Sequence, residues 1–461
     1  MAPSMHSWDD ETDVFAHSVI GYAIERLQLP KDTQWGAHPA SELAAELEHV
    51  LTPEGVGGLE ALRLFREVLL PACRPMDDPM NLAYVPTAPS VASTMFDLVV
   101  SASSIFGGNW EAGAGAIAAE NQALRWLADL AGFPEGAGGV FVSGGSAANL
   151  SALVTAREVF SQRRSSRPAR YTVAVTEEVH ASVRAAARVM DVDVLPVHTD
   201  DHGRMTGATL EAAISAHDAL DPAHGVFAVV ATGGTTNAGV VDELDGIADV
   251  CAARGLWMHV DGAYGLAALC STLARDKFHG IERADSFGVD PHKWLFAPYD
   301  SAALIYRDPA PAAATHAQHG AYLDAVDRGD WNPSDYAYHL SRRARGLPLW
   351  FGLATYGTLA YSAAVDGAIR TAHGFAAAVD DRPEFQLLLP PELSVVLFTR
   401  VGWTGEQYSQ WSKRRATEGR FLVVPTSWKG QPCLRICVVH PRTSLEQITK
   451  ILDDLAVYEP L

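Results

Sequence analysis

The sequence predicts an α/β protein with a mostly parallel central sheet, an N-terminal helical arm and a small C-terminal α/β domain. Two observations support this prediction. From about residue 96 onward, short apolar runs alternate with amphipathic segments, as expected of strands that helices cover on both faces. Before that point, apolar residues recur at helical spacing. The apolar runs are GVFVS, YTVAVT, VDVLPV, GVFAVVAT, GLWMHVD and SAALIYR.

The chain divides into three predicted parts. Residues 1–95 are the arm, in which AHSVIGYAIERL, SELAAELEHVL and LEALRLFREVL have helical periodicity and are separated by prolines. Residues 96–345 are the large domain. Residues 346–461 are the small domain, where one long helical stretch (LPLWFGLATYGTLAYSAAVDGAI) precedes the strand-like runs SVVLFTR, FLVVP and LRICVVH. The irregular segment 309–341 is a candidate mobile loop.

The composition excludes several classes of protein. A net charge of −20 disfavours binding to nucleic acid or to an anionic membrane, because no excess of cations exists to neutralise phosphates. No uninterrupted apolar run approaches about 18 residues, so we expect no membrane span. The five cysteines are scattered and form no CxxC, which indicates reduced thiols. The polar, acidic N-terminus lacks the regions of a signal peptide, and we expect a cytoplasmic protein.

A glycine-rich segment is the first of four features that follow predicted strands, where α/β sheets bind ligands. Residues 143–149 (SGGSAAN) follow the run GVFV and begin a helix. Small residues let the backbone approach a ligand, and the free N–H groups at the start of a helix favour an anion. The segment is neither a P-loop nor a dinucleotide-binding motif. Taken alone, such a segment is more often an ordinary turn.

Three single residues complete the set. Asp261 ends the run GLWMHV, where a carboxylate can pair with a protonated ring nitrogen, although a turn or helix cap is commoner. Lys293 lies between a histidine and a tryptophan, and we expect partial desolvation to favour its free amine, which can form an imine. A solvated surface lysine is the alternative. His180 begins a helix after YTVAVT and offers a flat ring for stacking, although a lone histidine is more often structural.

A phosphate cradle, a stacking imidazole, a partner for a pyridinium nitrogen and an imine-forming lysine are the groups that pyridoxal phosphate (PLP) requires. The chain resembles the group II PLP-dependent decarboxylases, the family of the aromatic-L-amino-acid, tyrosine and tryptophan decarboxylases. The resemblance implies the aspartate aminotransferase-like fold, called fold type I. It lies in the blocks GGVFVSGGSAANLSALVTARE, ATGGTTNAGVVDELDGIADV, LWMHVDGAYG, ADSFGVDPHKWLF and LSRRARGLPLW.

The resemblance implies a role for each matching residue. Lys293 matches the lysine that binds PLP as a Schiff base, and Asp261 matches the carboxylate that pairs with the pyridine nitrogen. His180 and Ala263 match the residues on opposite faces of the ring. Gly145 and Ser146 match positions of the phosphate loop. Thr236 and His292 match further cofactor contacts, and Tyr84 matches a residue of the substrate pocket.

The implied reaction is decarboxylation of an L-amino acid to the amine and CO2, with an aromatic substrate as one option. Phe106, like Tyr84, is a candidate for the substrate surface, although either could be a core residue. In the family a tyrosine on a mobile loop, reaching the neighbouring subunit's site, is linked to proton return. Tyr336 is the predicted residue here and Tyr338 the alternative. The resemblance therefore also implies a homodimer.

Two further positions bear on the site, and three other functions stay open. Asp290 stands where aromatic-specific members have asparagine, and Arg435 could bind a carboxylate or form a structural ion pair. The open functions are another PLP reaction on the same fold (a decarboxylating aldehyde synthase, an aminotransferase or an aldolase-type lyase), a non-catalytic homologue, and a metal enzyme. We expect no metal, because His316 and His319 have no evident carboxylate or thiolate partner.

Overall fold

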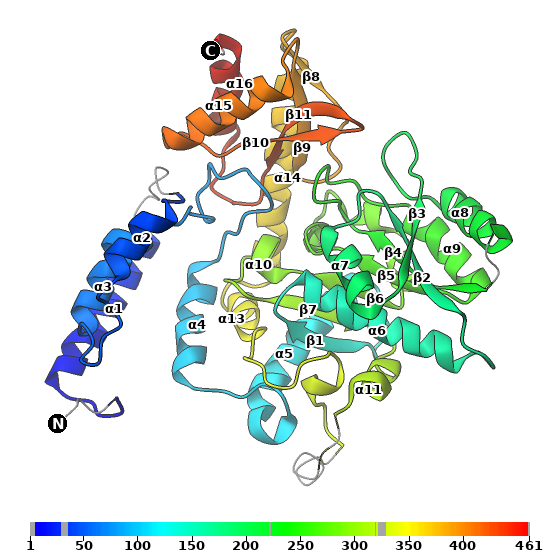
Figure 1. The fold of residues 1–461 in the computed structure, drawn as a ribbon, viewed down its shortest axis with the longest axis horizontal. Coiled ribbons are helices and arrows are strands. Elements are labelled where there is room, and N and C mark those ends of the chain that lie inside the picture. The colour runs from blue at the N-terminus through cyan, green and yellow to red at the C-terminus, as the bar shows by residue number, and fades with distance from the viewer. Residues whose placement is uncertain (1–4, 29–35, 221–222, 319, 321–328, 460–461) are drawn as a thin grey trace.

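The computed structural model describes residues 5–28, 36–220, 223–318, 320 and 329–459. A seven-stranded sheet forms the centre of the large body, and a four-stranded sheet forms the centre of a smaller C-terminal unit (Figure 1). The N-terminal helices stand to one side of both. No helix in the described part of the chain has the length and apolarity that crossing a bilayer requires.

The large sheet has the order β1-β7-β6-β5-β4-β2-β3. Strand β7 is antiparallel to both its neighbours, and the other pairs are parallel, which confirms the prediction of a mostly parallel sheet. The strands are β1 (Gly138–Val142), β2 (Arg170–Thr176), β3 (Asp193–Val197), β4 (His224–Thr232), β5 (Trp257–Asp261), β6 (Ser286–Val289) and β7 (Ala302–Tyr306).

Helices cover both faces of this sheet, which explains why its strands are apolar without interruption. In β1, Val140 and Val142 belong to one apolar cluster and Phe141 to the other, because successive side chains of a strand point to opposite faces. The first cluster includes α6 (Gly145–Gln162), α7 (Ala181–Met190) and α11 (Ala310–His316). The second includes α5 (Trp110–Leu130), α8 (Gly207–Leu220) and α9 (Leu244–Arg254).

The same alternation orients β5. Met258 and Val260 pack into the cluster that contains α5, α8 and α9. His259 and Asp261 therefore point to the opposite face, toward α6. Because Asp261 is the last residue of its strand, its carboxylate lies at the carboxyl edge of the sheet.

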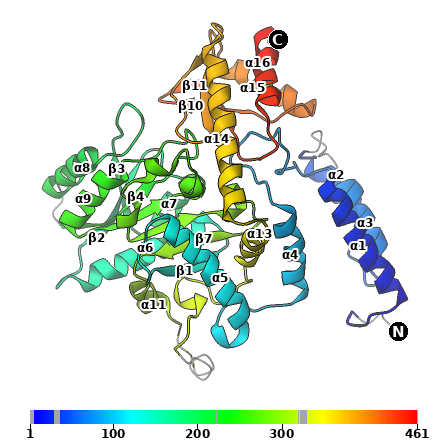
Figure 2. The ribbon, with the colours of Figure 1, turned by 180° about the vertical axis from the view of Figure 1, so that it is seen from behind.

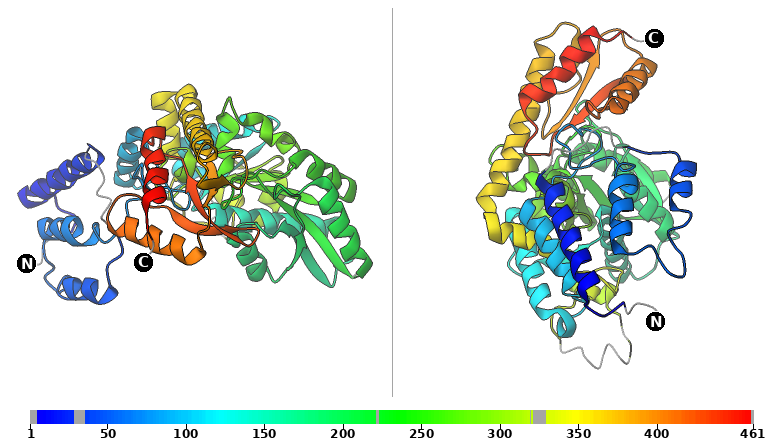
Figure 3. Two further views of the ribbon diagram at one scale, coloured as in Figure 1. Left: turned by 90° about the horizontal axis from the view of Figure 1, so that it is seen from above. Right: turned by 90° about the vertical axis from the view of Figure 1, so that its left-hand side faces the viewer.

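The N-terminal arm is exposed along its length. It contains α1 (Asp10–Gln28), α2 (Ala40–Leu47), α3 (Gly58–Leu64) and a π-helical turn (Phe65–Leu69), and α4 (Val91–Ala102) follows. The left view of Figure 3 shows the N-terminal helices, in dark blue, set apart from the body. No residue of α1 is buried. The arm therefore gains little stability from the rest of its own chain.

The long helix that we expected after residue 346 is two helices, of which the first packs on α4 and α5 of the large body. α13 (Leu347–Tyr356) and α14 (Thr358–Asp380) meet at Gly357, whose φ of 76° is not helical. Figure 2 shows α14 running from the large body to the small sheet. The remaining elements are β8 (Phe385–Leu387), β9 (Val395–Arg400), α15 (Gly405–Thr417), β10 (Val424–Trp428), β11 (Gln431–Cys437) and α16 (Leu445–Val457).

Short helices interrupt the connections of the large body. One of them is α11, so the segment 309–341 is not irregular throughout as predicted, because an apolar face of α11 packs on α6. The others are α10 (Pro291–Trp294) and the 3₁₀ turns Gly265–Cys270, Arg275–Phe278, Ile281–Arg283 and Pro333–Asp335.

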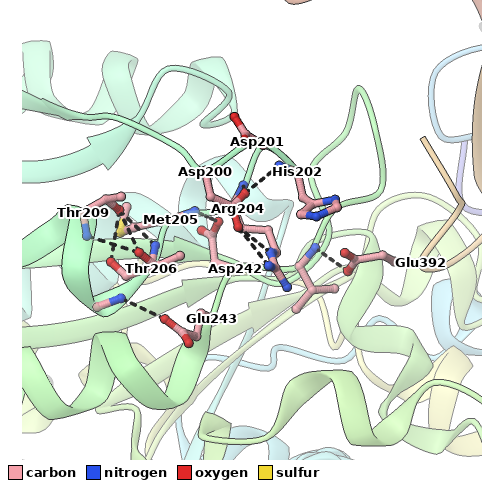
Figure 4. A network of polar contacts seen from close by, with 12 residues as sticks. Asp200, Asp201, His202, Arg204, Met205, Thr206, Thr209, Asp242, Glu243 and Glu392 are labelled. Carbon is pink, nitrogen blue, oxygen red and sulfur yellow. Dashed lines mark hydrogen bonds and ion pairs between the residues drawn. The ribbon is translucent and has the colours of Figure 1, made fainter. Parts of the chain in front are cut away.

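The buried carboxylate of Asp242 hydrogen-bonds to the loop that follows β3 and to the end of β4. Asp242 is 2% exposed and accepts hydrogen bonds of 2.7 Å from the amides of Met205 and Thr232. Burial raises the pKa of Asp242 to about 7. Figure 4 shows this cluster, in which Arg204 also pairs with Asp200 at 2.8 Å. These contacts fix the turn that follows β4, and β4 neighbours the strand that ends in Asp261.

Candidate active site

Lys293 lies in α10, just after β6, and its amine contacts a carboxylate. Its Nζ is 2.9 Å from Oδ2 of Asp290, which is 2% exposed. Burial alone lowers the pKa of Lys293, but the charges of Asp290 and Asp261 outweigh it and raise the pKa. The expectation that desolvation favours the free amine is therefore wrong for the chain without a cofactor, because Asp290 stabilises the ammonium form.

His292 is held in one tautomer beside the same carboxylate. Its Nδ1 accepts a hydrogen bond of 3.1 Å from the amide of Ser301, so Nε2 carries the proton. Nε2 lies 3.6 Å from Oδ2 of Asp290, and burial lowers the pKa of His292. Oδ1 of Asp290 is buried and has no hydrogen-bond partner among the described residues. Such an atom is unusual in a folded protein and indicates a place that a ligand completes.

Gly145 begins α6 at a position where a larger residue does not fit. A Cβ atom there would lie 3.1 Å from Cβ of Ala263 and 3.3 Å from both carboxylate oxygens of Asp290. The preceding residue, Gly144, provides no side-chain cap, so the first amides of this 18-residue helix, at Gly145 and Ser146, stay available to an anion. The predicted phosphate-binding segment, at the start of α6, therefore lies next to Asp290, three residues before Lys293.

Asp261 lies beside this cradle with both carboxylate oxygens hydrogen-bonded. Oδ2 accepts 2.9 Å from Nδ2 of Asn149, and Oδ1 accepts 3.2 Å from the amide of Ala263. Residue 261 pairs with Gly288 across β5 and β6, which brings it close to the segment that contains Lys293. Asp261 is 5% exposed, so this acceptor is largely shielded from water.

His180 is the N-cap of α7 and has an exposed ring. Its Nδ1 lies 2.8 Å from Oγ of Ser182, and that hydroxyl is 3.0 Å from Nδ2 of Asn149. Asn149 therefore joins His180 to Asp261. Sequence reasoning did not assign a role to Asn149, Ser182 or His259. The position of His259, two residues before Asp261 and so on the same face of β5, was the available signal.

Arg435 hydrogen-bonds to the backbone of two residues predicted for the site, Thr236 and Tyr84. Its guanidinium donates to the carbonyl oxygens of Thr236 (3.0 Å), Asn237 (3.1 Å) and Tyr84. Backbone carbonyls accept from Nε, Nη1 and Nη2 of Arg435, and no ion pair of this arginine is found among the described residues, so its structural contacts are to the backbone. Carboxylate binding by Arg435 stays a prediction. Tyr84 has a φ of 55° and its side chain is 61% exposed. The arginine thus fixes the backbone while the tyrosine ring faces outward.

Phe106 and Tyr336 lie in neighbouring segments, and among the described residues no hydrogen bond or ring contact joins them to Lys293. The Phe106 ring covers Gly108, whose carbonyl accepts a hydrogen bond from the amide of Ser334. Tyr336 stacks on Trp331 with ring centroids 4.0 Å apart, and burial raises the pKa of Tyr336 to about 12. In Figure 1 the turn between α4 and α5 lies at the lower edge of the molecule, whereas α10 is near its centre. Tyr338, in contrast to Tyr336, is 54% exposed.

His316, which we considered as a metal ligand, instead forms hydrogen bonds to helix α6. Its Nε2 lies 3.1 Å from Oγ1 of Thr155 and 3.1 Å from the carbonyl of Ser151, both on α6. His319 lies outside the described residues. Within those residues, no three His, Cys, Asp or Glu side chains gather closely enough to hold a metal ion.

The residues around Lys293 fit PLP. The amine can condense with an aldehyde, and a buried carboxylate at Asp261 suits a protonated ring nitrogen. The start of α6 suits a phosphate, since its first amides have no side-chain cap. Oδ1 of Asp290 is one of the buried polar atoms that lack a partner in the described part of the chain.

Comparison with known proteins agrees with this chemistry. Residues 59–401 match the family model described as the pyridoxal-dependent decarboxylase conserved domain. An aromatic-L-amino-acid decarboxylase from Bacillus atrophaeus is 30% identical over 94% of this chain and 93% of its own length. An L-2,4-diaminobutyrate decarboxylase from Rhizobium meliloti is 31% identical over 81% of this chain and 77% of its own.

The fold also has close relatives among solved structures. The structure of Oryza sativa TDC with PLP and tryptamine superposes with a TM-score of 0.90, covers 98% of both chains and has 24% identity. That of mouse CSAD superposes with a TM-score of 0.87 and 24% identity, over 96% of this chain and 98% of the other. The fold is therefore that of the PLP-dependent decarboxylases, as the sequence predicted. The chain belongs to the pyridoxal-dependent decarboxylase family and is a PLP-dependent carboxy-lyase that acts on amino acids.

Proposed function

We propose that this enzyme releases CO2 from an L-amino acid with an aromatic side chain and yields the corresponding amine, with PLP bound covalently at Lys293. The observation that supports this most directly is the position of the Lys293 amine, 2.9 Å from Asp290 and within the electrostatic reach of Asp261. When bound, PLP supplies an aldehyde that condenses with amines and a ring that accepts the electron pair left by CO2.

Asp261, His180 and Ala263 hold the ring in this proposal. The Asp261 carboxylate keeps the pyridine nitrogen protonated, because a nearby opposite charge favours the cationic form. The exposed imidazole of His180 covers one face of the ring, and the small side chain of Ala263 leaves room at the other. Lys293, once displaced by the substrate amine, is free to move protons at Cα.

In this proposal, residues around the start of α6 bind the phosphate of PLP and make the other polar contacts to the cofactor. The amides of Gly145 and Ser146 bind the phosphate, and the Nε2–H group of His292 faces the same space as the unpaired oxygen of Asp290. Thr236 lies at the edge of the site, where Arg435 fixes its carbonyl. The cofactor is therefore held by polar groups that the fold already orients.

Two exposed tyrosines favour an aromatic substrate. Tyr84 is 61% and Tyr299 51% exposed, and the Tyr299 ring lies 4.8 Å from that of His292. The charge of Lys293 also acts on the phenol of Tyr299, which places this ring close to the amine. A flat ring such as that of Tyr299 beside the reacting amine stacks well on an aromatic side chain.

We also propose that the enzyme is a homodimer in which Phe106 and Tyr336 of one subunit line the other subunit's site. In α1, Val14 is 55%, Ile20 43% and Ile24 42% exposed. Exposed apolar residues on a helix with no buried residue indicate a surface that another molecule covers. The separation of Phe106 and Tyr336 from Lys293 supports the same arrangement.

A substrate panel tests the proposed reaction. The PLP-loaded enzyme is incubated with L-tryptophan, L-tyrosine, L-phenylalanine, L-histidine, L-2,4-diaminobutyrate and L-glutamate, and CO2, amine, aldehyde and hydrogen peroxide are measured. We expect an aromatic amine and CO2 in equal amounts, and no product from Lys293→Ala. Preferential turnover of a non-aromatic substrate contradicts the substrate class. Aldehyde with hydrogen peroxide, or an exchanged amino group, contradicts the reaction.

Mixed dimers test the shared site. Lys293→Ala and Tyr336→Phe subunits are each expected to have little activity alone. When they are co-expressed, a heterodimer recovers one intact site, because its Lys293 and Tyr336 come from different subunits, and about a quarter of the wild-type activity returns in a random mixture. Sedimentation shows whether the chain is dimeric. A monomer, or a dimer without recovery of activity, contradicts the shared site.

A further inference from the structure

A row of buried hydrogen bonds runs from Trp257 to Asp261 on the α6 face of the sheet. Nε1 of Trp257 lies 2.9 Å from Oγ of Ser286, and Nδ1 of His259 lies 2.8 Å from the same oxygen. Nε2 of His259 is 2.9 Å from Oδ1 of Asn149, whose Nδ2 is 2.9 Å from Oδ2 of Asp261. Ser286 and His259 are 0% and Asn149 is 1% exposed, so water does not compete for these bonds.

The two ends of this row determine the direction of every bond in it. At one end Trp257 can only donate, and at the other a carboxylate oxygen of Asp261 accepts from Asn149. Because the Asn149 amide nitrogen faces Asp261, its oxygen must accept from Nε2–H of His259. Burial lowers the pKa of His259 to about 4, so its ring is neutral near pH 7 and Nδ1 accepts from the Ser286 hydroxyl.

A branch of the same row reaches His180. The second hydrogen of the Asn149 amide points to Oγ of Ser182, 3.0 Å away. That hydroxyl must then donate its own hydrogen to Nδ1 of His180, 2.8 Å away, and the amide of Ser182 donates to the same nitrogen at 3.2 Å. Nδ1 of His180 accepts from two donors, so the ring proton is on Nε2.

We propose that Asn149 and His259 are positioning residues, which together direct an acceptor at Asp261 toward the cofactor ring and fix His180 as its Nε2–H tautomer. The inference rests on the proposed roles of Asp261 and His180. Asn149 is the branch point, since a single amide group donates to both arms. His259 acts one step further away: it orients that amide by donating to its oxygen. An amide turned the other way would place two acceptors face to face at Asp261.

The tautomers can be measured without the cofactor. The full chain, labelled with ¹⁵N-histidine, gives side-chain NMR signals that distinguish Nε2–H from Nδ1–H, and His180→Gln and His259→Gln identify the two residues. We expect both histidines to carry their proton on Nε2. A proton on Nδ1 of either ring reverses the direction of the bonds and overturns the inference. This result does not depend on whether the proposed reaction is correct.

Isosteric variants test the effect on the cofactor. Asn149→Leu nearly keeps the shape of the side chain but has no group that can donate to Asp261. We expect kcat/KM to fall about 10- to 100-fold, the range of a hydrogen bond to a charged group. The ring nitrogen of bound ¹⁵N-PLP is expected to be protonated in the wild type and to lose protonation in the variant. Unchanged protonation in a folded variant contradicts the inference.

A pair of substitutions at His259 provides a second test should Asn149→Leu not fold. His259→Gln can still donate to Asn149, whereas His259→Leu cannot, and we expect only the leucine variant to lose kcat/KM and ring protonation. Equal losses in both would indicate a packing role and overturn the inference. Thr155→Val is the matched control: it removes a buried hydrogen bond from the same helix, to His316, and is expected to leave ring protonation unchanged. If the ring nitrogen of PLP in the wild type carries no proton, the proposed role of Asp261 is contradicted. The inference about Asn149 and His259 is then tested by the histidine tautomers alone.

Discussion

The Nζ atom of Lys293 lies 2.9 Å from Oδ2 of Asp290, three residues earlier in the chain. This contact joins the lysine proposed to bind PLP to a buried carboxylate. It stabilises the ammonium form of the lysine, which cannot condense with an aldehyde until it loses a proton.

Replacing Asp290 with asparagine is therefore expected to speed the uptake of PLP by the cofactor-free chain. The substitution removes the nearer of the two carboxylates that raise the pKa of Lys293, so burial is opposed mainly by Asp261 and the pKa falls. An adjacent opposite charge shifts a pKa by about 1–3 units, so we expect at least a tenfold faster reaction at pH 7. The pH profile of the rate, followed by absorbance, should move to lower pH. Asp129→Asn, at a surface ion pair, is the control. An unmoved profile contradicts this account of the lysine.

Asp261→Asn is expected to retain PLP but to lose about 10- to 10³-fold in kcat. An amide cannot hold the pyridine nitrogen in its cationic form, and one to three units of pKa correspond to this range. The substitution preserves the shape of the side chain, so the thermal unfolding midpoint serves as the check on folding. A kcat within threefold of the wild type would show that this carboxylate does not act on the ring.

Tyr336→Phe is expected to reduce amine formation about 100-fold, a usual effect of removing a general acid. The fold should be unaffected, because the ring can still stack on Trp331. Tyr338→Phe, two residues further on, is the matched comparison and should stay within threefold of the wild type. The opposite result, with Tyr338→Phe as the damaging change, assigns proton return to the exposed tyrosine.

The buried Asp242 predicts a pH dependence of stability. Its pKa is about 7 in the folded chain against an ordinary value of 3.8, so between these limits the folded state holds a proton that the unfolded state has lost. The contribution of Asp242 to the free energy of unfolding therefore falls as the pH rises from about 4 to 7, and this contribution is constant above pH 7. We expect the stability difference between the wild type and Asp242→Asn to fall by about 4 kcal/mol across this range. Denaturant unfolding at several pH values measures it, and a difference that grows with pH contradicts it.

The sequence was sufficient to predict the large sheet because its strands are buried on both faces. Phe141 packs on one face and Val140 on the other, so these strands appear in the sequence as uninterrupted apolar runs. The division between α13 and α14 was not predicted, because an isolated glycine is tolerated in a helical pattern and only the positive φ of Gly357 reveals the break.

The chemistry of single side chains was harder to predict than their positions. Lys293 was correctly placed in a partly buried site, but its pKa depends on the contact with Asp290, which sequence spacing does not give. Arg435 has donors that fit a carboxylate equally well, and only the fold shows that backbone carbonyls occupy them. Asn149 was within a recognised motif, yet its role depends on neighbours from β5 and α7.

The most direct test is to find which atom binds PLP. The full chain is loaded with PLP, reduced with borohydride, digested and analysed by mass spectrometry. We expect one modified peptide, with the phosphopyridoxyl group on Lys293, and loss of the visible absorbance on reduction. Modification of a different lysine, or none at all, would contradict the account of the site.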